Sequence, residues 1–391
     1  MFKSVLSLTL AAALGTASFG QTTLTAIPGE AAAAKYASIS QEILRAIEKG
    51  NEYLKSKQNP EGYWAQPSYP ALTALAVTAY MRDPANQGKP VPEYIRKGYD
   101  FILKSQKEDG SIFNRGMSSY NTAVCMMALL AANKEEYAPA ILKGRAYLIK
   151  QQNHFAPDNP YNGGIGYGDK QAPPIADLSN TSLALEAIYY SQKLAKDGKY
   201  GEQPDLDWNA ATEFINRCQQ NPAVNKEPWV SNDKSQLGGF VYRPGVSSAR
   251  DKKSAAFDKA DPPKAYGSMT YAGMQSLIYA NVDKNDPRVK LALKWLENSY
   301  SLDENPGMGV QGLYYYYQAM SKALSAMGID TLTLENGRKV DWRDELANKL
   351  ISIQKSDGSW VNTNNRWWEA DPVLVTSYCV LALEQLYHSI P

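Results

Sequence analysis

Hydrophobic and polar positions divide the chain into two alternating kinds of helical segment. In the first kind, apolar residues recur at helical spacing along one side and charges occupy the other, as around Leu346, Leu350 and Ile353. This pattern is typical of a helix with one face in water. Segments of this kind are predicted at residues 39–57, 91–105, 136–150, 207–220, 286–300 and 341–355.

Segments of the second kind follow the first and are apolar almost all round, as in the run from Ala71 to Val77. A helix that is apolar on every face is buried within a larger body. These segments are predicted at residues 69–81, 118–132, 177–192, 266–281, 310–326 and 372–388. The alternation predicts an all-α fold, an (α/α)6 toroid in which an outer ring of helices surrounds an inner ring.

A short phrase recurs where helices of the first kind end. Its copies are Gln58-Asn-Pro-Glu-Gly62-Tyr-Trp64, Gln106-Lys-Glu-Asp-Gly110-Ser-Ile-Phe113 and Gln354-Lys-Ser-Asp-Gly358-Ser-Trp360. Recurrence at this position indicates an array of helix-pair repeats. Glycine allows the positive φ that ends a helix, and the glutamine amide can bond to backbone groups of a loop. We therefore interpret the phrase as a link between repeats and assign it no chemistry.

Threonine also recurs, near the start of five segments of the second kind. These residues are Thr73, Thr122, Thr181, Thr270 and Thr376. Threonine tolerates a first helical turn and can bond to the backbone there. We use the series only to align the repeats.

The amino terminus has the pattern of a signal peptide at residues 1–20, with Lys3 followed by a short apolar core and a small-residue cleavage site. Residues 21–36 are predicted to be a flexible leader, and residues 37–391 a single toroid domain. We expect an exported protein, periplasmic or secreted. No second apolar run is long enough to span a membrane.

Composition narrows the range of partners. The formal net charge is +1, and no basic cluster with interleaved aromatics is present, which excludes nucleic acid as an expected partner. Tyrosine and tryptophan (26 and 8) far outnumber phenylalanine (8), and their polar groups suit cavity walls and wet interfaces. Cys125, Cys218 and Cys379 are interpreted as buried free thiols, with a disulfide left open.

The Gln-x-x-x-Gly-x-Trp phrase on alternating helices resembles the repeats of the squalene–hopene cyclase and protein prenyltransferase β-subunit superfamily. The resemblance covers nearly all of the chain after residue 36 and implies one terpenoid cyclase-like toroid. Class II cyclases of this superfamily protonate an alkene with the middle aspartate of Asp-x-Asp-Asp-Thr. The matching stretch here is Asp177–Thr181, where Ser179 occupies the position of the acid and Asn180 the position of the third aspartate. The resemblance therefore implies that catalysis is altered or lost.

The same resemblance implies that this chain lacks part of the zinc site of the prenyltransferases. Ala272 stands where the cysteine ligand would be, and the stretch 373–379 lacks the histidine. With two histidines and three scattered cysteines in the chain, a tetrahedral zinc site has too few ligands. No metal and no other cofactor is predicted.

A pocket is expected where the inner helices begin, because their unpaired N–H groups and positive dipole ends suit anionic groups. Asp177 is the candidate catalytic acid, although N-capping is the common role of aspartate at such a position. Asp371 is a weaker candidate with the same alternative. The long connections 152–176 and 221–265 precede inner helices and are expected at the same mouth.

Aromatic residues near this mouth are the candidate ligand-binding residues. They are Tyr120, Tyr167, Tyr242, Tyr266, Trp367 and Trp368. Aromatic walls suit an isoprenoid or another apolar ligand and its cationic intermediates, but they suit sugar rings equally. Four successive tyrosines at 314–317 point all round a helix, so at most two can face one cavity.

Three hypotheses for function remain open at this stage. The first is an exported toroid that binds an isoprenoid-like apolar molecule, with enzymatic activity left undecided. The second is a carbohydrate-active enzyme or glycan-binding protein, and the third is a non-catalytic scaffold for a protein partner. Because one fold can serve many functions, the fold cannot choose among them.

Overall fold

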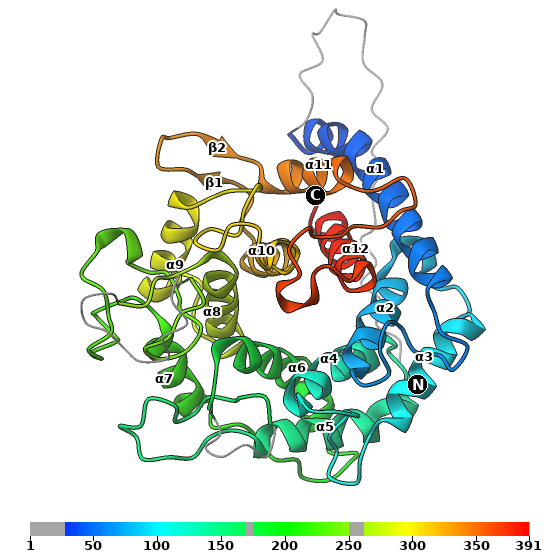
Figure 1. Cartoon of the computed structure of the whole chain (residues 1–391), viewed down its shortest axis with the longest axis horizontal. Helices are drawn as coiled ribbons and strands as arrows, with labels where there is room; N and C mark the ends of the chain where they lie inside the picture. The colour runs from blue at the N-terminus through cyan, green and yellow to red at the C-terminus, as the bar shows by residue number, and fades with distance from the viewer. Residues whose placement is uncertain (1–27, 169–174, 250–261, 391) are drawn as a thin grey trace, which may run out of the picture.

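The computed structural model describes residues 28–168, 175–249 and 262–390, and this part of the chain forms a closed double ring of helices (Figure 1). The outer helices are α1 (Pro28–Ser56), α3 (Glu93–Lys104), α5 (Ala138–Lys150), α7 (Trp208–Cys218), α9 (Pro287–Asn298) and α11 (Trp342–Ser352). The inner helices are α2 (Pro70–Arg82), α4 (Ser118–Ala131), α6 (Leu178–Lys196), α8 (Gly267–Tyr279), α10 (Leu313–Met327) and α12 (Pro372–Ser389). The predicted all-α toroid is confirmed.

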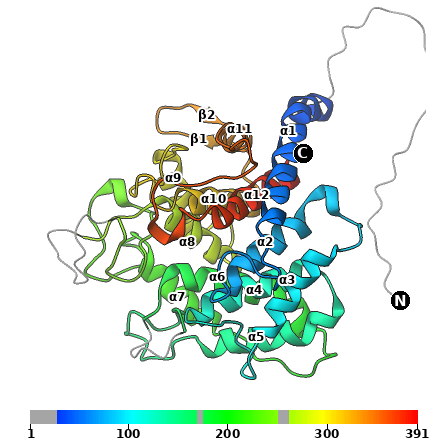
Figure 2. The ribbon, with the colours of Figure 1, turned by 45° about the vertical axis from the view of Figure 1, so that its right-hand side comes forward.

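Contacts between neighbouring inner helices close the ring. Helices α2, α4, α6, α8, α10 and α12 pack in this order, and α12 packs in turn against α2. Helices α2, α4, α6, α8 and α12 also pack against outer helices, and α1 packs against both α11 and α12. Figure 2 shows α1 along the edge of the ring beside the carboxyl-terminal helices. The first and last segments of the described chain are therefore neighbours.

The burial pattern follows the predicted division into two kinds of helix. In α12 every residue from Val373 to Glu384 is buried, so this helix has no face in water. In the outer helix α3, Ile95, Tyr99 and Ile102 are buried while the intervening charged positions are exposed. The core is thus the shell between the two rings, where the outer stripes cover the inner helices.

The repeated phrase and its degenerate copies join the outer helices at five of the six junctions of the ring. Gln58 donates one amide bond to the Gly62 carbonyl (3.0 Å) and another to the Tyr94 carbonyl of α3 (2.7 Å). The same pair of bonds comes from Gln106, Gln152, Gln219 and Gln354. Gln354 donates to the Ala46 carbonyl of α1 and so connects the last outer helix to the first.

The glycine of the phrase is required by a close backbone approach. Gly110 has φ +90°, and a Cβ atom there would lie 2.2 Å from the carbonyl oxygen of Lys143 in the next outer helix. Gly62, Gly163, Gly238 and Gly358 meet the same kind of carbonyl at 2.0 to 2.5 Å. A side chain at these positions would push two repeats apart, which supports the interpretation of the phrase as a link.

The recurring threonines bind the phrase to the inner ring. Thr73 Oγ1 accepts a hydrogen bond from the Trp64 amide (3.0 Å), and Thr376 does so from the Trp360 amide (3.1 Å). Thr122, Thr181 and Thr270 accept the equivalent bonds from Ile112, Ile165 and Phe240. These buried amides lie in turns outside the helices, so the hydroxyls satisfy donors that would otherwise lack a partner.

The junction between α9 and α11 is built differently. A short antiparallel hairpin, β1 (Leu332–Thr333) and β2 (Lys339–Val340), lies beside it, with Leu332 opposite Val340. The Thr333 amide donates to Glu297 Oε1 of α9 at 2.8 Å. A carboxylate of α9 therefore binds the hairpin at this junction, where the other junctions use the glutamine bonds. Short 3-10 turns complete the described elements: η1 (Pro84–Asn86), η2 (Glu135–Tyr137), η3 (Lys234–Gln236) and η4 (Arg366–Trp368).

The bounds of most helices differ from the predictions by a few residues. The difference is larger for α1, which begins at Pro28, before the predicted start at residue 39 and within the segment 21–36 predicted to be a flexible leader. The predicted signal peptide lies outside the described residues. Within the described ranges no helix is both long and apolar enough to cross a membrane. Cys125, Cys218 and Cys379 are buried and free.

Candidate functional site

A cavity of about 530 Å³ lies where the inner helices begin, at the centre of the ring. We name it the aromatic chamber. Its walls include all six aromatic residues predicted from the sequence, which are Tyr120, Tyr167, Tyr242, Tyr266, Trp367 and Trp368. Tyr69, Tyr315 and Tyr378 add three further rings. The tertiary structure therefore brings together residues that are scattered over most of the chain.

The two long connections meet at this mouth, as predicted. The Tyr167 carbonyl accepts a bond from the Ser119 amide (3.0 Å), which holds the first connection at the start of α4. The Tyr242 carbonyl accepts a bond from the Leu178 amide (2.8 Å), which holds the second at the start of α6. The two tyrosine hydroxyls lie 3.5 Å apart. Inner-helix amides thus position both rings.

The tryptophan pair forms an exposed rim of the chamber. Trp367 and Trp368 have φ of 55° and 65°, in the left-handed region that bulky side chains rarely adopt. The Trp368 ring lies against Tyr69 with centroids 4.7 Å apart, and the Arg366 guanidinium lies over Trp367 at 4.4 Å. Nearly half of each tryptophan remains exposed (46% and 41%). Such strain at an exposed apolar rim is a recurring property of binding sites.

Only one of the four tyrosines at 314–317 lines the chamber. Tyr315 faces it from the first turn of α10. The other three donate hydrogen bonds to backbone carbonyls, Tyr314 to Val361, Tyr316 to Ser301 and Tyr317 to Leu302. These three rings fix loops to the helix, in agreement with the prediction that at most two could face a cavity.

Asp177 caps the start of α6 and does not line the chamber. Its Oδ1 accepts from the Asn180 amide and its Oδ2 from the Asn180 side chain, both at 2.8 Å. Burial raises the pKa of Asp177 to about 6, although the bonds from Asn180 and Tyr242 and the charge of Arg243 act in the opposite direction. Tyr242 stands between this carboxyl and the chamber. A catalytic role for Asp177 stays a prediction.

Asp371 also acts as an N-cap. Its Oδ1 accepts from the Val373 amide at 2.8 Å, at the start of α12. N-capping by aspartate is worth about 1 kcal/mol. This cap explains why an aspartate stands at this position, without a role in chemistry.

Ser179 faces the chamber at the position that resembles the acid of the class II cyclases. It lies two residues before Thr181, and Tyr120, Ser268 and Leu374 stand two residues before the threonines of their own repeats and also line the chamber. Ser179 bonds to the Tyr315 hydroxyl across the cavity. Residues two places before these threonines therefore share the wall of the chamber, and in α6 this position carries a hydroxyl and no acid.

Glu369 is a chamber residue that the sequence reasoning missed. Its Oε1 accepts from the Tyr315 amide (2.8 Å), and its Oε2 accepts from Asn362 (2.7 Å). Burial raises the pKa of Glu369, while these hydrogen bonds lower it. Helix α10 begins after Gly312, which has no capping side chain, so Glu369 supplies the cap from a distant loop. No local sequence signal marks such a long-range contact.

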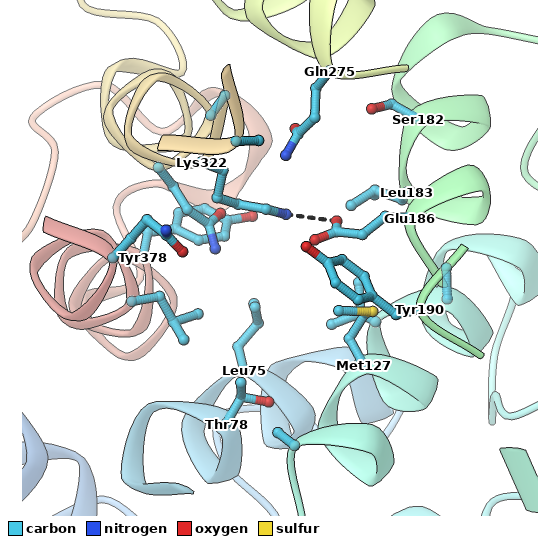
Figure 3. A pocket seen from close by; sticks show the side chains of 18 of the residues that line it. Leu75, Thr78, Met127, Ser182, Leu183, Glu186, Tyr190, Gln275, Lys322 and Tyr378 are labelled. Atoms are coloured by element: carbon cyan, nitrogen blue, oxygen red, sulfur yellow. Dashed lines mark hydrogen bonds and ion pairs between the residues drawn. The ribbon is translucent and has the colours of Figure 1, made fainter. Parts of the chain in front are cut away.

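A second cavity of about 570 Å³ lies on the side where the inner helices end. We name it the ionic chamber, because Arg82, Glu186 and Lys322 line it. Figure 3 shows Glu186 and Lys322. Lys322 of α10 reaches across to Glu186 of α6, with Nζ and Oε2 2.5 Å apart. The two cavities share Tyr120, Leu183, Tyr315 and Tyr378. The two cavities therefore adjoin at these four side chains inside the ring, and we refer to the two together as the channel.

The ionic chamber was also missed, although the repeat alignment contained a signal for it. Glu186 stands five residues after Thr181, and the residues five places after the other recurring threonines are Thr78, Met127, Gln275 and Leu381. All five line the ionic chamber. A charged residue at this register of an otherwise apolar helix could have been recognised as facing the channel.

Among the described residues, no group of three or more histidine, cysteine, aspartate or glutamate side chains could hold a metal ion. Ala272 is buried in α8, where the resemblance implied a missing cysteine ligand. Burial also raises the pKa of the Cys379 thiol well above its usual value, which disfavours the thiolate that a metal needs.

Known structures with a similar fold come from the terpenoid and prenyl-transfer enzymes. The type II terpene cyclase MstE from Scytonema matches with 11% identity over 90% of this chain and 99% of its own, at a TM-score of 0.54. A variant of this cyclase, in complex with the substrate geranylgeranyl dihydroxybenzoate, matches at 0.53 and 10% identity, with the same coverage. Candida albicans protein geranylgeranyltransferase-I, complexed with GGPP, matches at 0.55 with 14% identity, over 88% and 91% of the two chains.

No protein-family model matches the chain. The structural likeness nevertheless extends over most of the ring, so the chain has the α/α toroid fold of terpenoid cyclases and protein prenyltransferases. This agrees with the resemblance seen in the repeated phrase. Identities of 10 to 14% demonstrate the fold, and activity has to be argued from the residues of the channel.

Proposed function

We propose that the protein binds an isoprenoid, or a similar apolar chain, in the aromatic chamber. The observation that carries the proposal is the wall of the cavity, in which nine aromatic rings from helices and loops surround about 530 Å³. This volume lies within the range of about 300 to 1,000 Å³ typical of small-molecule sites. Transfer of a hydrocarbon chain from water to such a wall contributes about 25 cal/mol per Å² of buried apolar area.

The structural neighbours support the class of ligand. The cyclase neighbour is complexed with a geranylgeranyl substrate, and the transferase neighbour with GGPP. Both hold these molecules on the same kind of ring. An apolar chain of this class is therefore the first ligand to test.

We infer that the usual class II protonation does not occur here. Ser179 faces the chamber, and a serine hydroxyl is far too weak an acid to protonate an alkene. The two carboxyls nearby are engaged elsewhere, Asp177 with Asn180 and Glu369 with the first amides of α10. On this proposal the isoprenoid is bound but is not cyclised by class II protonation. Export of the protein, suggested by residues 1–20, is proposed alongside.

The test is a calorimetric titration of the purified protein with geranylgeraniol, together with lipid extraction and native mass spectrometry. We expect saturable binding, and a loss of about five- to tenfold in affinity for Trp368→Ala, because a tryptophan ring supplies a large part of the apolar contact. Trp208→Ala is the matched control, since Trp208 lies on the outer helix α7 and lines neither cavity.

Two results would contradict the proposal. Absence of binding to geranylgeraniol and to a panel of shorter and longer isoprenoids would remove the proposed ligand class; binding of a glycan panel instead would favour the carbohydrate hypothesis. Formation of cyclised products from squalene or geranylgeraniol would refute the inference that the Ser179 position cannot protonate an alkene.

A further inference from the structure

We propose that the ionic chamber binds an anionic head group of the same ligand whose apolar chain lies in the aromatic chamber. The inference rests on the proposed function and adds the polarity and orientation of the ligand. The inner helices hold the charges of the ionic chamber near their ends, on the opposite side of the ring from Asp177 at the start of α6.

Three charged side chains line the ionic chamber. Arg82 ends α2, while Glu186 of α6 and Lys322 of α10 point toward each other, as Figure 3 shows for this pair. Helices α6 and α10 flank α8 in the ring, so the Lys322–Glu186 ion pair crosses the channel in front of α8. The pair therefore lies where a ligand that entered from either side would meet it.

Burial makes this ion pair costly to keep for stability alone. The exposed fractions of the two side chains are 20% for Lys322 and 7% for Glu186. Desolvation of a buried pair commonly cancels much of its attraction, and apolar residues of similar size are often as stable. A buried ion pair that faces a cavity is therefore a candidate for ligand recognition.

The charges facing the ionic chamber leave one positive charge in excess, because Arg82 and Lys322 face a single carboxylate, Glu186. Arg82 donates to the neutral Gln385 amide oxygen (2.8 Å) and has no carboxylate partner among the described ion pairs. Glu384 is buried near Arg82 without lining the chamber, and burial raises its pKa well above its usual value, which favours its neutral form. The chamber therefore favours an anion.

Polar atoms around the charges could complete a head-group site. Gln275 and Gln318 line the chamber, and Gln275 donates to the Tyr279 hydroxyl at 2.8 Å. The hydroxyl oxygen of Ser325, also in the wall, is buried and lacks a hydrogen-bond partner within the described part of the chain. Buried polar atoms are normally paired, so this hydroxyl indicates a missing polar neighbour.

At the opposite end of the channel, the starts of α6, α10 and α12 are already capped by carboxylates of the protein itself, so these three helix N-termini are not free to bind an anion. The charged group that lines the aromatic chamber is Glu369, and both of its oxygens are already used by α10 and Asn362. A phosphate or carboxylate placed there would be repelled by Glu369. The orientation with the chain among the aromatic rings and the head at Lys322 and Arg82 is thus the favourable one.

One molecule that occupies both chambers has to pass the four side chains that line both of them. Tyr315 and Lys322 lie on the same helix, and seven residues at 1.5 Å each place them about 10 Å apart along α10. Tyr120, Leu183, Tyr315 and Tyr378 line both cavities. An extended isoprenoid is longer than this step, so its head can reach Lys322 from the aromatic chamber once these side chains move apart to let the chain through.

The experiment compares geranylgeraniol with geranylgeranyl phosphate and geranylgeranoic acid by calorimetric titration. We expect both anionic lipids to bind about tenfold or more tightly than the alcohol, because charge-assisted hydrogen bonds are added. Lys322→Met should reduce the ratio of the two affinities, anionic lipid to alcohol, to about twofold. Glu186→Gln should raise it, because the competing carboxylate is removed from Lys322.

Matched variants separate recognition from general effects. Lys322→Arg keeps the charge and should keep most of the ratio. Lys349→Met is the control, because Lys349 lies on the outer helix α11, pairs with Asp303 and faces neither chamber. It should leave the ratio unchanged. The Glu186→Gln result remains decisive if Lys322→Met does not fold.

The outcomes distinguish this inference from the proposed function. If the alcohol binds in the aromatic chamber but the anionic lipids show no advantage, or if Glu186→Gln lowers their advantage, the head-group site is refuted and the proposed function stands. If neither the alcohol nor the anionic lipids bind, the proposed function itself falls. A preference for only one of phosphate and carboxylate would identify the head group and support the site.

Discussion

The outer junctions and the central channel of this ring are built in opposite ways. At the junctions, glutamine makes the same two bonds in five repeats and glycine meets the same backbone carbonyl. In the channel, equivalent positions carry residues of three types, since the positions two places before the threonines are Tyr120, Ser179, Ser268 and Leu374. Repetition therefore marks the scaffold, where the steric demand is identical, and variation marks the candidate site.

The largest expected effect is at a junction glycine. Gly110→Ala should cost about 3 to 5 kcal/mol of unfolding free energy, because a left-handed backbone and a clash with the Lys143 carbonyl act together. The free energy is measured by urea denaturation. Gly88→Ala is the control, since Gly88 has a similar positive φ (+75°) but nothing within 4 Å of the added atom. Equal losses in the two variants would show that backbone strain, and not contact between repeats, makes the glycine necessary.

Asp177 lies at the boundary between the scaffold and the channel, and its raised pKa should make the unfolding free energy depend on pH. Its pKa of about 6 in the folded state exceeds the ordinary value of 3.8, so the folded protein holds this proton more tightly. The contribution to stability is complete below about pH 4 and is lost as the pH rises through 6. The unfolding free energy of the wild type relative to Asp177→Asn should fall by up to about 3 kcal/mol between pH 4 and pH 7.

The asparagine variant isolates this effect because asparagine is as good an N-cap as aspartate. Other carboxyls titrate equally in both proteins and cancel in the difference. A difference that stays constant over this pH range would mean that the Asp177 carboxyl is not desolvated, and it would remove the main reason for considering it as an acid.

A smaller effect is expected at the threonines that tie the turns to the inner ring. Thr181→Val should cost about 1 to 3 kcal/mol, because the buried Ile165 amide loses its acceptor. Thr212→Val is the control, since that hydroxyl bonds only within its own helix, to the Trp208 carbonyl. Thermal denaturation compares the two. If Thr181→Val were as harmless as the control, the threonines would not belong to the scaffold.

Much of this architecture could be predicted because its causes are local. The periodicity of apolar residues marks each helix, and the glutamine and glycine of the phrase lie four residues apart, as Gln106 and Gly110 do. The aromatic lining was also predictable, since Trp367, Trp368 and Tyr266 stand next to inner-helix starts. The start of α1 was misplaced because an alanine-rich segment with little amphipathic pattern can still continue a helix.

The sequence by itself determined the alternation of amphipathic and apolar helices, the turns between them and hence the ring. The tertiary structure decided which side chains share the channel. Closure of α12 onto α2 brings Arg82, Glu186 and Lys322 to one cavity, although more than a hundred residues separate each from the next. It also brings Glu369 to the start of α10. Local propensity cannot encode such encounters, because they depend on the summed geometry of all the repeats around the ring.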